Sequence, residues 1–317
     1  MRALWPRTGF GNMQYRRLGK TELEVSAVGL GGWALGGGYD WGNVEFADVQ
    51  NTVCAALDNG ITLIDTAPIY GNSEEVLGRA LAGRRQEVVL CTKCGLVKNG
   101  SWTDHDLRPE TISRQLENSL KNLKTDTIDV YFIHYLDPQV SWQSALEMLT
   151  RLQAQGKIRY IGVCNIPPEI LAQMAQTGVI ACVQDELSLL HPAKGQAVLN
   201  ICKQYGLGFL SYGSLCGGIL SGKYAKAPNL RRADARNYFY KCYRAEDFER
   251  AQQTVTRVQQ VAARKAVEPA QTALAWVLKQ DGVTCALTGA RSAAQIAQNA
   301  SAAELTLSAE DLCSLVK

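Results

Sequence analysis

The sequence predicts an α/β protein in which eight parallel strands close into a (β/α)8 TIM barrel. Eight short runs rich in β-branched residues recur along the chain, with segments of helical periodicity between them. Strands that alternate with single helices pair in parallel, and eight such units favour a closed barrel over a doubly wound sheet. The 317 residues accommodate one barrel of about 250 residues with long loops at its carboxyl-terminal rim. Because no linker or interior shift in composition divides the chain, we predict one domain over residues 13–317.

The predicted barrel strands are short and bounded by turn residues. They are Val25–Gly31, Ile61–Thr66, Glu87–Lys93, Ile128–His134, Tyr160–Asn165, Ala181–Glu186, Gly206–Tyr212 and Val283–Gly289. An amino-terminal β-hairpin, formed by residues 13–18 and 23–25, is expected ahead of the first of them. Residues 1–12 contain no apolar core of a signal peptide, so we expect a loose, flexible extension there.

Helix signals lie between these strands. The apolar residues between Phe46 and Leu57 fall on one helical face, and Gly60 follows where a left-handed residue ends a helix. Pro109 suits a first helical turn, and apolar residues follow it at helical spacing. Gly206 ends another such segment. The same sequence pattern therefore recurs along the chain, as a repeated strand–helix unit requires.

Composition excludes several classes of function. The 33 basic and 30 acidic side chains give a net charge of +3, too small for the basic stripe of a nucleic-acid-binding protein. No apolar stretch approaches the roughly 20 residues of a membrane-spanning helix. Ten cysteines in a chain of this length do not form the dense pattern of a small secreted scaffold. We therefore expect a cytoplasmic protein with reduced thiols, either a monomer or a weak homo-oligomer.

Three neighbouring strands end in ionisable residues on the same face. Because side chains alternate along a strand, Asp65, Lys93 and His134 each follow apolar residues that point into the barrel. Tyr70 lies in the turn after Asp65. Barrel enzymes build their active sites at the carboxyl ends of the strands, so we expect the four side chains to converge there. The alternative for each residue taken alone is a structural ion pair or a packed side chain.

These four residue types suit the protonation of an oxygen that becomes negatively charged. A phenol with a pKa of about 10 donates a proton poorly at neutral pH unless a cation stabilises its phenolate. Lys93 supplies that cation, Asp65 holds its ammonium group, and His134 hydrogen-bonds the atom that receives the proton. Hydride transfer to a carbonyl carbon requires such an acid, because it leaves an alkoxide.

Several blocks of the sequence resemble the aldo-keto reductase family from Tyr15 to about Leu312. The blocks are "YRRLGKTELEVSAVGLGGW", "GITLIDTAPIYGNSEEVLGRAL", "LCTKCG" and "IDVYFIHYLD". The resemblance implies a catalytic tetrad of the same four residues: Asp65, Tyr70, Lys93 and His134. It also implies an NADPH-dependent enzyme that reduces a small-molecule aldehyde or ketone to an alcohol.

Further blocks resemble the cofactor site of that family. They are "IGVCN", "CVQDEL", "LSYGSLCGGILSGKY" and "LTGARSAAQIAQNASA". The resemblance implies that Asn165 and Gln184 contact the carboxamide of NADP(H) and that Tyr212 stacks on the nicotinamide. It implies that Arg291 contacts the 2′-phosphate. The remaining implied contacts to the pyrophosphate and the adenosine come from Gly213, Ser214, Leu215, Gly289, Gln295 and Asn299.

Aromatic residues cluster in the predicted loops, where they line a substrate pocket or pack the loops themselves. They are Trp33, Tyr39 and Trp41 after the first strand, Tyr135 after the fourth strand, and Tyr238, Phe239 and Tyr240 in the long irregular stretch from about Cys216 to Arg244. An aromatic rim favours apolar or aromatic substrates. The arginines of the long loop are interpreted as a solvated basic face; they are Arg231, Arg232 and Arg236.

Two motifs suggest other chemistry but fail on inspection. Residues 29–38 contain glycines spaced like a dinucleotide-binding fingerprint, but Ala34 stands in place of the third glycine. Cys91 and Cys94 form a C-x-x-C pair whose sulfur atoms, by strand alternation, point to opposite faces. A zinc site needs further ligands, so no metal is expected.

Two rival functions fit the same residues. A Schiff-base aldolase would use Lys93 to form an imine with a carbonyl substrate. A regulatory subunit of the same family, like the potassium-channel β subunits, would bind NADPH tightly and turn over poorly.

Overall fold

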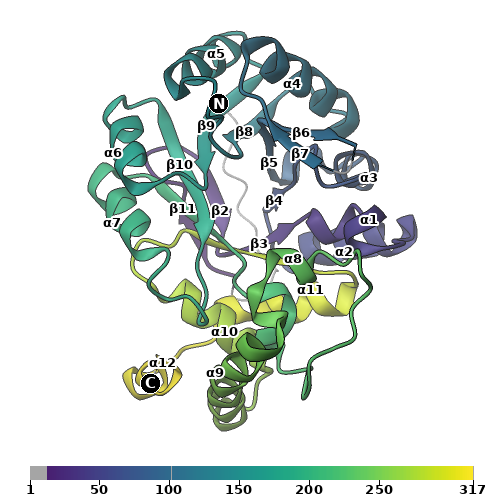
Figure 1. Ribbon diagram of the computed structural model, residues 1–317, viewed down its shortest axis with the longest axis vertical. Helices are drawn as coiled ribbons and strands as arrows, with labels where there is room; N and C mark the ends of the chain where they lie inside the picture. The colour runs from purple at the N-terminus through teal and green to yellow at the C-terminus, as the bar shows by residue number, and fades with distance from the viewer. Residues whose placement is uncertain (1–12, 101, 317) are drawn as a thin grey trace.

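The computed structural model describes residues 13–100 and 102–316. Eight parallel strands close into a barrel in the order β10-β11-β12-β3-β4-β5-β8-β9 (Figure 1). The predicted fold class is therefore confirmed. The expected extension over residues 1–12 lies outside the described residues, and the prediction of one domain over 13–317 stays a prediction.

The barrel strands match the predicted runs closely, except for the first. Their bounds are β3 Val28–Gly31, β4 Leu63–Asp65, β5 Val89–Cys94, β8 Ile128–Ile133, β9 Ile158–Cys164, β10 Ile180–Glu186, β11 Gly208–Tyr212 and β12 Cys285–Gly289. The first predicted run is divided, because its beginning belongs to the hairpin of β1 (Tyr15–Arg17) and β2 (Glu24–Ser26). The Ser26 hydroxyl donates to the Val28 carbonyl at 2.6 Å, which marks the break before β3.

Helices cover the outside of the barrel (Figure 1). Their bounds are α2 Phe46–Asp58, α3 Ser73–Ala80, α4 Pro109–Leu123, α5 Trp142–Ala154, α6 Pro168–Gln176, α7 Gln196–Tyr205, α9 Ala245–Lys265, α10 Pro269–Leu278, α11 Ala293–Ala300 and α12 Ala309–Val316. The predicted end signals are confirmed: Pro109 is the first residue of α4, and Gly206 ends α7 with a φ of 68°. Gly60, with a φ of 77°, directly follows the Asn59 cap of α2.

The barrel interior is apolar and closed at its amino end. Inward-pointing residues such as Leu63, Cys91 and Phe132 pack with Leu18 and Leu23 of the hairpin segment. The loops that follow the strands lie at the carboxyl end of the barrel. Cys94 belongs instead to the core between strands and helices, which confirms that the two sulfur atoms of the C-x-x-C pair face opposite ways.

A buried charge cluster joins three strands on the outer side of the barrel. Asp129 of β8, with a side chain only 2% exposed, pairs with Arg85 and Arg159, each at 2.8 Å. Its carboxylate also accepts a hydrogen bond from the Leu90 amide at 2.9 Å. This single carboxylate therefore links β5, β8 and β9.

Short elements form the carboxyl-terminal rim. After β3 come η1 (Trp33–Leu35) and α1 (Gly38–Trp41), and after β5 comes a second hairpin. That hairpin consists of β6 (Leu96–Asn99) and β7 (Trp102–His105), and it was not predicted. The long loop after β11 contains short helical elements: η3 Cys216–Ser221, α8 Arg236–Phe239 and η4 Lys241–Tyr243.

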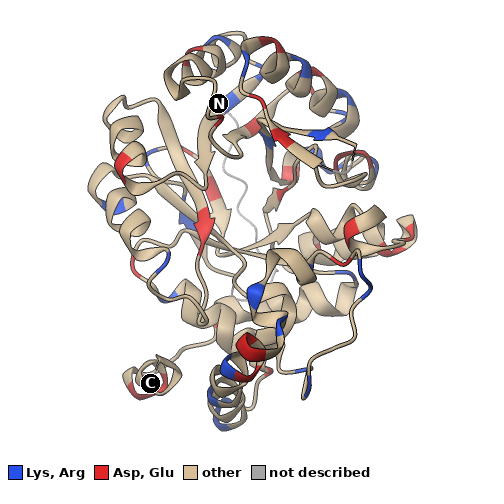
Figure 2. Cartoon of the chain, viewed as in Figure 1, with Lys and Arg blue, Asp and Glu red and all other residues tan. Residues whose placement is uncertain are grey.

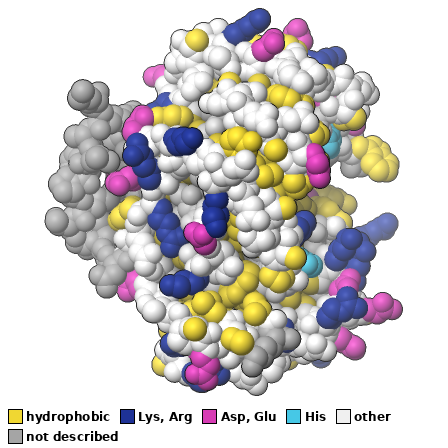
Figure 3. All heavy atoms as spheres, turned by 90° about the vertical axis from the view of Figure 1, so that its left-hand side faces the viewer, with side chains coloured by type: hydrophobic (Ala, Val, Ile, Leu, Met, Phe, Trp, Pro, Cys, Tyr) yellow, Lys and Arg dark blue, Asp and Glu magenta, His cyan; other side chains and the backbone are white. Residues whose placement is uncertain are grey.

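The surface carries both signs of charge. Lysine, arginine and acidic residues are interspersed over the outer helices (Figure 2), and the face turned toward the viewer in Figure 3 mixes them with small apolar areas. Within residues 13–100 and 102–316, no helix has the length and apolar character needed to cross a membrane.

Candidate active site

The centre of the site is a buried ion pair between adjacent strands. Lys93 is fully buried, and its Nζ atom lies 2.7 Å from both carboxylate oxygens of Asp65. The same Nζ donates to the Thr66 carbonyl at 2.9 Å. Gln184 donates a further hydrogen bond to Asp65 at 2.8 Å. The register between the adjacent strands β4 and β5 brings Lys93 to Asp65, because Asp65 is paired with Cys91, two residues before Lys93.

Tyr70 reaches the ion pair from the turn after β4. The Nζ atom of Lys93 lies 5.0 Å from the centre of the Tyr70 ring. The His134 ring approaches Tyr70 edge-on, with ring centres 5.8 Å apart. Gly36, in the loop after β3, allows this turn to approach closely, because a Cβ atom at position 36 would lie 1.7 Å from the Tyr70 carbonyl oxygen. The structure thus brings the four predicted residues together, while their chemical roles stay predictions.

Burial dominates the electrostatics of the site. It raises the pKa of Tyr70 above the ordinary phenol value, and Lys93 lowers that pKa by less. Lys93 therefore acts on the Tyr70 pKa in the direction expected from the sequence, but burial has the larger effect. Burial also lowers the pKa of Lys93, but Asp65 and Tyr70 raise it more, so the net pKa lies above its usual range. Burial, then Lys93 and His105, hold the pKa of His134 well below its usual value. At neutral pH the phenol and the ammonium group keep their protons, and the imidazole is uncharged.

Residues expected at the nicotinamide form a connected set beside His134. Asn165, which has a φ of 55°, donates from Nδ2 to the His134 carbonyl at 3.0 Å. Its Oδ1 atom accepts a hydrogen bond from the Tyr212 hydroxyl at 2.7 Å. Cys164 is fully buried, and burial raises the pKa of its thiol. These bonds fix the side chains of Asn165 and Tyr212 at the mouth of the barrel.

A cavity of about 1270 Å³ opens above this centre. Three of the tetrad residues line it, while Lys93 lies beneath its floor. All ten residues that the resemblance assigns to the cofactor also line it: Asn165, Gln184, Tyr212, Gly213, Ser214, Leu215, Gly289, Arg291, Gln295 and Asn299. The cavity exceeds the usual range of a site for one small ligand, about 300–1,000 Å³. It therefore has room for a dinucleotide together with a small substrate.

Basic side chains lie at several points around this cavity. Arg291 is exposed at the rim, where its guanidinium donates to the Asn43 carbonyl at 3.1 Å. Gln295 accepts from the Arg291 amide at 2.9 Å, and Asn299 donates to the Thr288 hydroxyl at 3.0 Å. Lys223 lines the cavity as well. The side chains of Gln295 and Asn299 thus order the segment that carries Arg291.

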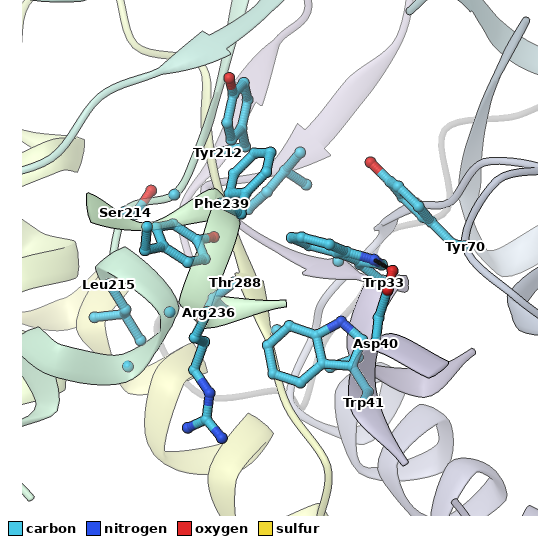
Figure 4. Close-up of a pocket in the computed structure, with 18 of the residues that line it drawn as sticks. Trp33, Asp40, Trp41, Tyr70, Tyr212, Ser214, Leu215, Arg236, Phe239 and Thr288 are labelled. Atoms are coloured by element: carbon cyan, nitrogen blue, oxygen red, sulfur yellow. Dashed lines mark hydrogen bonds between the residues drawn. The ribbon is translucent and has the colours of Figure 1, made fainter. Parts of the chain in front are cut away.

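Arg236 was wrongly interpreted as part of a solvated face. Its side chain is only 16% exposed and makes two 2.8 Å hydrogen bonds to the Asp234 carboxylate. It also donates to the Tyr224 hydroxyl at 2.6 Å and is among the residues that line the cavity (Figure 4). The only signal in the sequence was an acidic residue two positions before the arginine.

Aromatic rings form the wall of the cavity next to Tyr70. Trp33 is stacked on Tyr70 with ring centres 5.8 Å apart, and it meets Trp41 and Phe239 edge-on at 5.4 and 5.0 Å (Figure 4). Tyr135 also lines the cavity, and its ring is stacked on His134 at 5.3 Å. The other predicted aromatic residues, which line the same cavity, are Tyr39, Tyr238 and Tyr240.

Two parts of the cavity wall were missed in the sequence. Lys98, Trp102 and Thr103 of the unpredicted hairpin border the cavity, although the candidate pocket residues were expected after the first and fourth strands and in the long loop. Asp40 borders it too. Among the described residues, no group of three or more histidine, cysteine or acidic side chains is arranged to hold a metal ion.

Comparisons with known proteins agree with the fold and the motifs. The sequence model of the Aldo/keto reductase family matches residues 27–317. The aldo-keto reductase YhdN of Bacillus subtilis is 36% identical over 305 residues, covering 94% of this chain and 91% of that protein. This chain therefore belongs to the aldo/keto reductase family, whose members are oxidoreductases that act on carbonyl compounds with nicotinamide cofactors.

Other relatives differ in their named activities. The NADH-specific methylglyoxal reductase of Escherichia coli is 33% identical over 313 residues, covering 93% of this chain and 94% of that protein. The solved structure of a glycerol dehydrogenase from Gluconobacter oxydans superposes with a TM-score of 0.86 at 31% identity. That match covers 95% of this chain and 93% of the other.

Proposed function

We propose that this protein reduces aldehydes or ketones to alcohols with NADPH and that Tyr70 donates the proton. One observation carries the proposal: a protonated phenol, a buried Lys93–Asp65 ion pair and an uncharged His134 meet at the floor of one large cavity. This combination suits an oxygen that gains negative charge during the reaction.

The residues around the cavity fit a nicotinamide dinucleotide. Asn165 and Gln184 offer amide groups near the tetrad, and Tyr212 offers an aromatic ring. Backbone groups from Gly213 to Leu215, together with the basic side chain of Lys223, suit the pyrophosphate. When bound there, the cofactor supplies the hydride that the carbonyl carbon receives.

Tyr70 is proposed as the catalytic acid. Because its pKa is raised, the hydroxyl keeps its proton at neutral pH and is available to the carbonyl oxygen. Once the proton has left, the Lys93 ammonium group, 5.0 Å from the ring centre, stabilises the phenolate. Asp65 keeps that ammonium group in place through two 2.7 Å hydrogen bonds.

His134 is proposed to orient the substrate. An uncharged imidazole carries one N–H, which donates a hydrogen bond to the carbonyl oxygen beside Tyr70. Because no charge is placed there, His134 does not compete with Tyr70 as the source of the proton. The carbonyl is thereby held with its oxygen toward the phenol.

We propose NADPH rather than NADH because of Arg291. Its guanidinium is exposed at the rim of the cavity and is held there by the Asn43 carbonyl. An arginine in this position can form a charge-assisted hydrogen bond with a 2′-phosphate. The Escherichia coli relative is named as NADH-specific, so the two nucleotides are compared in the test below.

The first test is a fluorescence titration with NADPH and NADH, followed by a screen of aldehydes and ketones for loss of cofactor absorbance. Tight NADPH binding with turnover supports the reductase. Tight binding without turnover on any carbonyl supports the regulatory alternative. An adduct on Lys93 after borohydride treatment with a carbonyl substrate supports the aldolase alternative, and absence of binding to either nucleotide overturns the cofactor assignment.

A further inference from the structure

We propose that Asp40 is a positioning residue that holds the Trp33 indole against Tyr70 and thereby makes the mouth selective for small carbonyl substrates. The inference rests on the proposed function, because it concerns the wall of the same site. It assigns a role to a carboxylate that the proton transfer itself does not use.

Asp40 accepts two hydrogen bonds, one from each side of the cavity. Its Oδ2 atom accepts from Trp33 Nε1 at 3.2 Å, and its Oδ1 atom accepts from the Tyr238 hydroxyl at 2.5 Å. Figure 4 shows the carboxylate at the indole nitrogen, with the Trp33 ring between Tyr70 and Phe239. Asp40 is thus the polar link between the loop after β3 and the loop after β11.

The carboxylate bonds only to uncharged side-chain donors. Within the part of the chain that the structure describes, no lysine, arginine or histidine lies within ion-pair distance of Asp40. The nearby Arg236 is occupied by Asp234. A hydrogen bond with one charged partner is roughly twice as strong as one between neutral groups. The carboxylate therefore favours the indole orientation in which Nε1 points toward it.

The helix that carries Asp40 has few other anchors. Helix α1 is one turn long, contains no buried residue and is preceded by Gly37, with a φ of 61°. Gly42, which ends it, has a φ of 74°. Segments with few buried contacts open more readily than core elements. The position of Asp40 therefore depends on its own side-chain bonds, on a 3.1 Å bond from the Ala235 amide to its carbonyl, and on the contacts of the neighbouring Trp41 ring with Trp33 and Arg236.

Trp33 is the group through which Asp40 acts. Its ring is stacked on the proposed proton donor, so any carbonyl that reaches the Tyr70 hydroxyl lies next to the indole. Its indole nitrogen donates its hydrogen bond to Asp40. Without that contact the packing against Tyr70, Trp41 and Phe239 remains, but the indole is less firmly oriented, so a small carbonyl loses a fixed wall and a bulky one gains room.

The test is a double-mutant cycle with Asp40→Ala and Trp33→Phe. Trp33→Phe keeps an aromatic ring but removes the N–H donor. Each single variant is expected to lower kcat/KM for propanal about tenfold, mainly through KM, as loss of a bond to a charged group predicts. The loss for benzaldehyde should be less than about threefold, and the Kd for NADPH should stay within about twofold. If Asp40 acts through Trp33, the double variant shows no further loss.

Two further variants protect the test against a folding defect. Tyr238→Phe removes the other hydrogen bond to Asp40, so it should lower kcat/KM for propanal in the same sense as Asp40→Ala but by less, since the bond to Trp33 remains. Asp40→Asn keeps the shape of the side chain, but its amide group can accept at only one atom, so an intermediate loss is expected. Additive losses in the double variant, or equal losses for the two aldehydes, would overturn the proposal.

A second readout does not depend on turnover. When introduced into the wild-type protein, Asp40→Ala should increase the quenching of tryptophan fluorescence by acrylamide. When introduced into the Trp33→Phe variant, the same substitution should leave the quenching unchanged. An equal change in both backgrounds would show that Asp40 does not hold Trp33. If the wild-type protein reduces no aldehyde or ketone in the screen, the proposed function fails, while the quenching result still decides the link between Asp40 and Trp33.

Discussion

The Nζ atom of Lys93 and the carboxylate of Asp65 form a 2.7 Å ion pair in which the lysine is fully buried and the aspartate side chain is 5% exposed. A buried ion pair is costly to desolvate, and breaking it strands the remaining charge. The Nζ atom lies 5.0 Å from the centre of the Tyr70 ring, so the ion pair is positioned to act on the phenol.

Replacing Lys93 separates this chemical role from a structural one. Lys93→Met is expected to lower kcat at least about 100-fold and to lower the free energy of unfolding by about 3–5 kcal/mol, since Asp65 then lies buried without its cation. The double variant Lys93→Met/Asp65→Asn should recover much of the stability but none of the activity. Urea denaturation and steady-state kinetics measure the two effects; recovery of both together would contradict a chemical role.

The pH dependence follows from the direction of two pKa shifts. Because burial raises the pKa of Tyr70, carbonyl reduction should lose its acid only above the ordinary phenol pKa of about 10. Because the pKa of His134 is held well below its usual value of about 6.5, no loss of rate should appear near neutrality. We expect kcat/KM to be flat between about pH 6.5 and 10. A limb with an apparent pKa of 6 to 7 that disappears in His134→Gln would contradict this assignment.

Cofactor preference should depend on Arg291. Arg291→Ala is expected to raise the KM for NADPH about tenfold or more, as loss of a charge-assisted bond predicts, and to leave the KM for NADH nearly unchanged. Arg244→Ala, at a basic residue that is not among those lining the cavity, serves as the control. Equal effects of Arg291→Ala on both nucleotides would disprove contact with the 2′-phosphate.

Much of this site could be predicted because strand periodicity fixes it. Asp65, Lys93 and His134 were placed at one rim by the alternation of side chains along neighbouring parallel strands. The loops follow no such rule. Asp40 and Tyr238 are 198 positions apart, and only the folded chain brings them into contact.

The sequence pattern also failed where one run of residues belongs to two different elements of the fold. The apolar stretch from Val25 to Gly31 reads as one strand, but the hairpin uses its beginning and the barrel its end. The sequence also could not predict whether burial or the nearby lysine has the larger effect on the pKa of Tyr70. A lysine nearby lowers a phenol pKa, but the opposing effect of burial depends on packing that only the structure provides.

Asp129 should be a main contributor to the stability of the barrel. Asp129→Ala removes the partner of Arg85 and Arg159 and leaves the Leu90 amide without its acceptor, so we expect a loss of about 3–5 kcal/mol in the free energy of unfolding. Asp58→Ala, which breaks a 3.4 Å pair at an aspartate 64% exposed, should cost about 0–1 kcal/mol. Comparable losses from the two substitutions, measured by urea denaturation, would refute this ranking.

The Tyr70 hydroxyl is the proposed source of the proton. The most direct test of this role is a single-turnover measurement with Tyr70→Phe, which keeps the ring beside Lys93 and removes only the hydroxyl. We predict that the Kd for NADPH stays within about twofold of the wild-type value and that the rate of carbonyl reduction falls at least about 100-fold. A variant that binds NADPH normally and reduces the same carbonyl at a wild-type rate would contradict the role of Tyr70 as the proton donor.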